Sequence, residues 1–149
     1  MQAQILAPAA VLVLWSLIML TWLAITRLPA IAKAGGLSAA KPGGRGQDLE
    51  GVIDDRINWK SHNYTHLMEQ PTIFYATVAI LAIMGAGALD VLLAWAYVAI
   101  RIVHSLWQAT VNRVPVRFTL FSLATASLLV LAVRAVMATL LHDPATVTG

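Results

Sequence analysis

Three polar side chains recur at helical spacing inside an apolar stretch near the middle of the chain. His62, His66 and Glu69 occupy positions i, i+4 and i+7, so an α-helix would present all three on one face. A carboxylate inside such a stretch is costly unless it is paired, protonated or hydrated. Glu69 therefore indicates either a functional site or a structural ion pair, with Arg101 or Arg117 as the partner.

A second polar stripe follows with the same kind of spacing. Arg101, His104 and Gln108 occupy positions i, i+3 and i+7, and two more cations, Arg113 and Arg117, come shortly after them. Together they predict a cationic, hydrogen-bonding pocket for a ligand with carboxylates, because a guanidinium group binds a carboxylate through two parallel hydrogen bonds. For Arg113 and Arg117 the alternative is a position at a helix end, with the charged groups extended into water.

A metal site is a further interpretation of these residues. The pattern His62-x3-His66-x2-Glu69 has ligand spacing on one helix face, and His104 is a candidate for a fourth ligand. Pairs of histidines at helical spacing are common by chance, so we assign no metal ligand. The chain contains no cysteine, which excludes a catalytic thiol of its own, a cysteine-bound metal and a disulfide.

The composition shows what kind of structure must position these side chains. Of the 149 residues, 59% are hydrophobic and only 11% are charged, with a mean hydropathy of +0.75. A soluble domain carries roughly 25% charged residues. So few charges do not cover a water-facing surface, so lipid must cover much of the exterior. The composition therefore excludes an ordinary soluble globular protein.

Four apolar runs are each long enough to cross a bilayer as a helix. They cover residues 5–27, 62–84, 89–110 and 116–141. A loop rich in glycine, proline and charge, residues 28–61, separates the first two runs, and the other connections are short. We expect an all-α membrane protein, residues 1–149, that forms one up-down bundle of four transmembrane helices. No basic residue precedes the first run, which is also too long for a cleaved signal peptide.

The distribution of basic residues predicts an orientation. Nine of the ten lysines and arginines lie in the first or third connection, or in a helix at the end nearer to one of these connections. They are Arg27, Lys33, Lys41, Arg45, Arg56, Lys60, Arg101, Arg113 and Arg117. The positive-inside rule then places the long loop in the cytoplasm and both termini outside it. This accounts for the net charge of +3 without a nucleic-acid partner. Asp90 and Arg134 lie toward the opposite face of the membrane. They either form an ion pair or extend separately to the membrane–water interface.

Two blocks of this sequence resemble a known family. Residues 96–105 (AYVAIRIVHS) and 112–117 (NRVPVR) look like the segment that joins the third and fourth helices in the MAPEG superfamily, the membrane-associated proteins in eicosanoid and glutathione metabolism. Residues 67–75 (LMEQPTIFY) resemble its other signature, a Glu followed closely by Pro and Phe on the second helix. The resemblance covers all four predicted helices. The chain resembles a bacterial-type member of the family, which implies a location in the bacterial inner membrane.

The resemblance implies a homotrimer that binds glutathione between neighbouring subunits near the cytoplasmic side. Glu69 matches the glutamate that holds the amino end of glutathione. Arg101 and His104 match polar positions of the third helix, and Arg113 and Arg117 match the basic pair at the start of the fourth. The arginine near the second position of that pair stabilises the thiolate, so Arg117 is the expected catalytic residue.

His66 and Gln108 complete the expected glutathione-binding set, although they depart from the pattern. His66 stands where many members have Asn, Gln108 where several enzymes have a ligand-contacting Tyr, and Phe118 where a hydroxyl residue follows the arginine. Two hypotheses follow. The first is a glutathione-dependent transferase or peroxidase acting on a lipophilic electrophile. The second is a non-catalytic subunit or scaffold that packs against another membrane protein complex.

Overall fold

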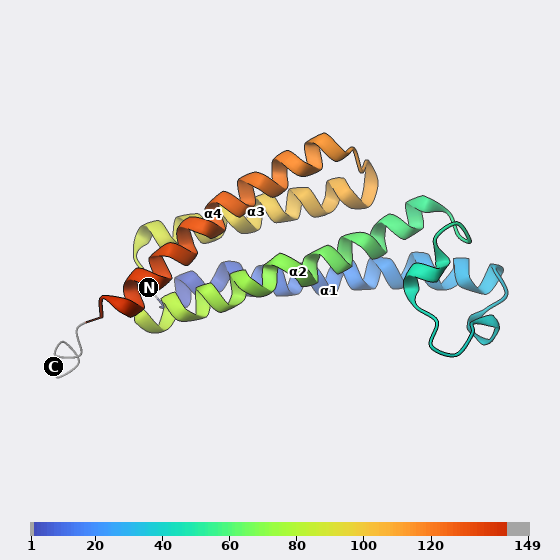
Figure 1. The fold of residues 1–149 in the computed structure, drawn as a ribbon, viewed down its shortest axis with the longest axis horizontal. Coiled ribbons are helices and arrows are strands. Elements are labelled where there is room, and N and C mark those ends of the chain that lie inside the picture. Colours follow the sequence, from blue (N-terminus) through green and yellow to red (C-terminus); the bar gives the residue numbers. More distant parts are fainter. Residues whose placement is uncertain (1, 143–149) are drawn as a thin grey trace.

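The computed structural model describes residues 2–142, which form four long helices (Figure 1). The helices are α1 (Gln2–Lys33), α2 (Asp55–Met84), α3 (Ala88–Thr110) and α4 (Val114–Leu140). Two short 3₁₀ turns, η1 (Leu37–Ala39) and η2 (Gly46–Leu49), lie in the loop between α1 and α2. All four long helices have the length and apolar character needed to cross a membrane. Residues 1 and 143–149 of the predicted domain lie outside the described part.

The helices run alternately up and down. The α1–α2 loop and the α3–α4 connection lie toward one end of the bundle, whereas the start of α1 and the α2–α3 connection lie at the other (Figure 1). α1 packs on α2, α3 packs on α4, and α2 also contacts both α3 and α4. This arrangement confirms the predicted four-helix membrane bundle.

All four helices begin before the predicted spans, and two of them extend well beyond these spans. α1 continues through Pro29 to Lys33, and α2 begins at Asp55. The early start of α2 has a local cause, because the Asp54 side chain caps the helix by accepting a hydrogen bond from the Arg56 backbone N–H at 2.7 Å. The connecting loop therefore covers residues 34–54, and the first turns of α2 project beyond the apolar run.

Two tight turns fix the ends of the helices. Gly85 closes α2 with a left-handed φ of 95°, the conformation that glycine adopts without steric cost. Asn112 adopts φ 55° in the α3–α4 connection, and asparagine tolerates this region better than most residues. Pro115 then lies in the first turn of α4, where its missing N–H costs little.

The core joins all four helices. Leu12, Leu67, Phe74, Tyr97 and Leu131 are buried in one apolar cluster, and the rings of Phe74 and Tyr97 stack with centroids 4.4 Å apart. Large apolar side chains elsewhere on the helices stay exposed, which is the expected surface for contact with lipid.

Two sets of polar contacts also join the helices. Gln70 links three helices, because its amide donates to Thr125 at 2.8 Å and accepts from the Tyr97 hydroxyl at 3.2 Å. Asp90 forms an ion pair with Arg134 and also accepts from the Gly87 N–H at 2.8 Å. Of the two predicted alternatives for Asp90 and Arg134, the ion pair is therefore confirmed.

Candidate functional site

A fully buried arginine organises the polar centre of the bundle. One terminal nitrogen of Arg101, on α3, donates to Nδ1 of His66 at 3.0 Å and to the His66 carbonyl oxygen at 3.1 Å. Since a guanidinium group only donates, Nδ1 of His66 is the acceptor. The His66 ring also stacks on His104, with centroids 4.9 Å apart and planes 20° apart. The two predicted stripes, on α2 and α3, therefore meet.

A small cavity opens next to this centre, at the loop end of the bundle. It measures about 220 Å³. The loop, α2 and one residue of α3 line it, through Gly46, Gln47, Glu50, Ser61, His62, Thr65, His66, Glu69 and Gln108. Three of the predicted glutathione contacts, His66, Glu69 and Gln108, thus share one cavity. Glu69 is solvent-exposed there, and in the described part of the chain it forms no ion pair.

The start of α4 brings Arg117 to the same region. The ring of Phe121, one turn after Arg117, lies 5.4 Å from the His66 ring and 6.5 Å from the His104 ring. Arg117 itself is half-buried. Its Nη1 donates to Oδ1 of Asn112 at 2.5 Å. The left-handed turn at Asn112 therefore also orients the guanidinium group of Arg117.

Two of the residues with candidate roles do not join the polar centre, although one of them, His62, lines the cavity. Arg113 is exposed and precedes the first turn of α4, where its backbone carbonyl accepts from the Trp107 indole at 3.3 Å. His62 binds Glu50 of the loop at 2.9 Å instead of sharing a ligand with His66 and Glu69. Among residues 2–142 no three histidine or carboxylate groups are placed to hold a metal ion.

Several buried polar atoms of the centre have no hydrogen-bond partner in the described chain. They are Nε and Nη1 of Arg101, Nδ1 of His104, Oε1 of Gln108 and both amide atoms of Asn63. Leaving such atoms unpaired costs about 1–3 kcal/mol each. The set contains donors, acceptors and a full positive charge, which is the chemistry needed to bind a peptide-like anion.

Sequence patterns did not identify several neighbours of this centre. The loop residues Gly46, Gln47 and Glu50 form one wall of the cavity, and Phe121 covers the stacked imidazoles. The Trp15 indole of α1 donates to Ser105 Oγ of α3 at 3.0 Å. Asn63 lies on α2 between His62 and His66, so helical spacing places it beside them, whereas no periodic pattern covers the residues of the loop.

The four apolar helices and the polar centre at one end of the bundle define a polytopic α-helical integral membrane protein. Comparison with protein families gives a more specific assignment, because the model of the MAPEG family matches residues 5–137. The chain belongs to the MAPEG family. No curated protein and no solved structure matches it. The predicted family is therefore confirmed over most of the chain, by the family model alone.

Proposed function

We propose that the chain is a glutathione-dependent transferase or peroxidase that acts on a lipophilic electrophile. Membership of the MAPEG family supports glutathione-related chemistry in a membrane. The observation that carries the proposal is the fully buried Arg101, which has two nitrogen atoms without a partner in the described chain and is hydrogen-bonded to His66 of the cavity lining. A buried cation of this kind calls for an anionic group as its partner.

The functional groups of glutathione match side chains that line the cavity and two further ones, Arg101 and His104, that contact His66 of the lining. Glutathione carries two carboxylates, one ammonium group, two amides and a thiol. The exposed carboxylate of Glu69 is suited to the ammonium group, Arg101 to a carboxylate, and His66, His104 and Gln108 to the amides. Small-molecule sites usually measure about 300–1,000 Å³, and this cavity is smaller. We therefore expect it to receive one end of the tripeptide.

Arg117 is the proposed catalytic residue. A thiolate is a far stronger nucleophile than a thiol, and a neighbouring positive charge favours the thiolate. The hydrogen bond to Asn112 fixes the direction of the Arg117 guanidinium group. In a transferase reaction the sulfur would form a bond to an electrophilic carbon of the second substrate, and the leaving group would depart with the bonding electron pair. The second substrate would approach from the lipid.

The assembly and the orientation belong to the same proposal. We infer a homotrimer with the glutathione site near the cytoplasmic side, both termini outside the cytoplasm, and a bacterial inner-membrane location. The positive-inside rule supports this orientation, because the basic residues gather at the end of the bundle that carries the α1–α2 loop. Arg113, which is exposed and does not line the cavity, is proposed to contact glutathione only from a neighbouring subunit.

Equilibrium binding tests the proposal. Glutathione is titrated into the detergent-solubilised wild type and into Arg117→Ala, with Arg56→Ala as a matched control, because Arg56 is an exposed cation outside the cavity. We expect saturable binding by the wild type and by Arg56→Ala, and weaker binding by Arg117→Ala. No binding at millimolar glutathione would contradict the proposal. Co-purification of a stoichiometric membrane partner in its place would favour the scaffold hypothesis.

A further inference from the structure

A larger cavity lies between the C-terminal part of α1 and the α1–α2 loop. It measures about 580 Å³, within the range typical of small-molecule sites. α1 contributes Arg27 and Ile31 to its lining, and the loop contributes Leu37, Lys41 and Val52 among others. None of the predicted glutathione contacts lines it. The two cavities share only Gly46.

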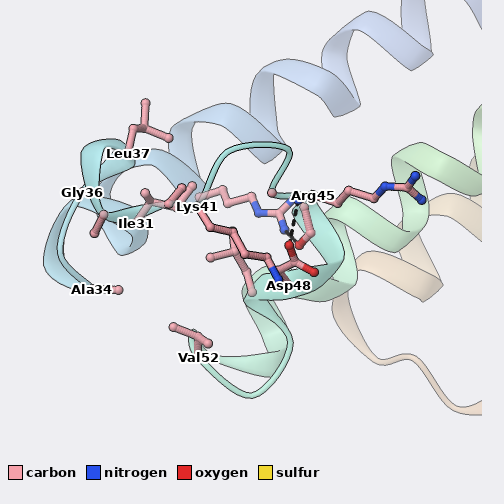
Figure 2. A pocket seen from close by; sticks show the side chains of 14 residues that line it. Ile31, Ala34, Gly36, Leu37, Lys41, Arg45, Asp48 and Val52 are labelled. Atoms are coloured by element: carbon pink, nitrogen blue, oxygen red, sulfur yellow. Dashed lines mark hydrogen bonds between the residues drawn. The ribbon is translucent and has the colours of Figure 1, made fainter.

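One part of the lining is apolar and open. Figure 2 shows Ile31, Leu37 and Val52 around the cavity, from both α1 and the loop. Both Leu37 and Val52 lie in the loop that follows the membrane-spanning helix α1. The Leu37 residue is 70% exposed and the Val52 residue is 59% exposed. Apolar side chains gathered at such a position indicate contact with an apolar group rather than with water.

The other part of the lining is charged, and among its charged side chains Arg27 makes the most hydrogen bonds. Its Nη1 donates to Ser61 Oγ at 2.7 Å, and its other terminal nitrogen donates to the Gly46 carbonyl oxygen. Its Nε is buried without a partner among the described residues. A Cβ atom on Gly46 would come within 2.9 Å of this guanidinium group. The glycine therefore allows Arg27 to pack directly against the loop backbone.

Lys41 and Asp48 complete the charged part. Figure 2 shows both side chains in the middle of the lining, whereas the side chain of Arg45 leads away from them. Oδ2 of Asp48 accepts from the Arg45 backbone N–H at 2.9 Å. Arg45 also belongs to the lining, but its side chain leads away from the other charged groups, so the remaining Arg27, Lys41 and Asp48 give the cavity one net positive charge next to its apolar side chains.

We propose that this cavity binds the headgroup of an anionic phospholipid, with the phosphodiester at Arg27 and Lys41 and the start of an acyl chain along Ile31. One net positive charge matches the single negative charge of a phosphodiester whose remaining headgroup is uncharged, such as glycerol, and Asp48 accepts hydrogen bonds from its hydroxyl groups. Arg27 ends the first apolar run, so the cavity lies at the depth of lipid headgroups, where basic residues recruit anionic lipids.

Native mass spectrometry of the full chain, titrated with phosphatidylglycerol or with zwitterionic phosphatidylcholine, tests this proposal. We expect the wild type to retain phosphatidylglycerol several-fold better. Lys41→Gln should lose most of that preference, and Val52→Asp should lower retention of the lipid. Arg56→Gln, which removes an exposed cation outside the cavity, should leave the preference unchanged. Circular dichroism confirms that each variant keeps its helical content.

Three outcomes would overturn the proposal. The first is equal retention of the two lipids by the wild type. The second is an equal loss of preference in Arg56→Gln and Lys41→Gln, because this would show a general effect of surface charge. The third is displacement of the lipid by inorganic phosphate at similar concentration, because the site would then recognise a free anion. The proposal does not depend on glutathione binding, so it is tested independently of the proposed function.

Discussion

Replacing Arg101 by methionine separates a structural role for this buried cation from a ligand-binding role. The side chain is fully buried and makes two hydrogen bonds to His66, and its remaining N–H groups Nε and Nη1 have no partner in the described chain. Methionine is unbranched, similar in length and compatible with a helix. Arg101→Met therefore removes the charge without leaving a large cavity.

The expected change in stability is small because two effects oppose each other. Two hydrogen bonds from a charged donor contribute about 1.5–3 kcal/mol each, and both are lost. Removing a buried cation without an acidic partner recovers a desolvation cost of several kcal/mol. The free energy of unfolding should therefore stay within about 2 kcal/mol of the wild-type value.

The expected change in ligand affinity is large. If Arg101 binds a carboxylate of glutathione, the variant loses a charge-assisted interaction of about 1.5–3 kcal/mol. Since about 1.4 kcal/mol corresponds to tenfold in affinity, the dissociation constant should rise roughly 10- to 150-fold. Arg101→Lys keeps the charge but not the bidentate geometry of the guanidinium group, so its affinity for glutathione should lie between those of the wild type and Arg101→Met.

Two measurements on the detergent-solubilised protein are needed. Denaturant titration followed by circular dichroism gives the stability, and isothermal titration with glutathione gives the affinity. Wild-type affinity in Arg101→Met would refute a ligand-binding role. Loss of stability by much more than about 2 kcal/mol would show that the cation is compensated inside the protein and that its role is structural.

Two further predictions concern the turns at the ends of the bundle. Asn112→Gly keeps the left-handed turn but removes the amide that orients Arg117, so glutathione turnover should fall while stability holds. Asn112→Ala should in addition be about 1–2 kcal/mol less stable than Asn112→Gly, as denaturant titration can show; equal stability would count against strain at this turn. Asp90→Ala should lower the free energy of unfolding by about 1–2 kcal/mol, because it removes the carboxylate that accepts from the Gly87 N–H and pairs with the partly exposed Arg134. A loss below about 0.5 kcal/mol would show that neither contact contributes to stability.

The fold was predictable because a membrane leaves few alternatives. A bilayer sets the length of a spanning helix, and connections too short to cross back force neighbouring helices to run antiparallel. The meeting of His66 with Arg101 and His104 follows from the same logic, since helical spacing fixes a face and antiparallel packing fixes the depth. The pair between Asp90 and Arg134 was predictable as one of two alternatives, because both residues are charged and both lie toward the same end.

The loop side of the site was not predictable. Its placement depends on contacts between residues far apart in sequence, such as Arg27 with Gly46 and His62 with Glu50. No periodic pattern encodes such contacts. The direction of Arg113 depends on the backbone at the α3–α4 turn, which leaves its side chain exposed, whereas Arg117, four residues later, is half-buried and bound to Asn112.

The state of the thiol in bound glutathione tests the central claim most directly. The ultraviolet absorbance of the thiolate, followed across pH in the wild type and in Arg117→Ala, reports the pKa of that thiol. We predict that wild-type protein lowers this pKa below the value for free glutathione, and that Arg117→Ala returns it toward that value, so the thiolate fraction near neutral pH falls about tenfold. The same thiol pKa in both proteins, with glutathione bound to each, would contradict the account.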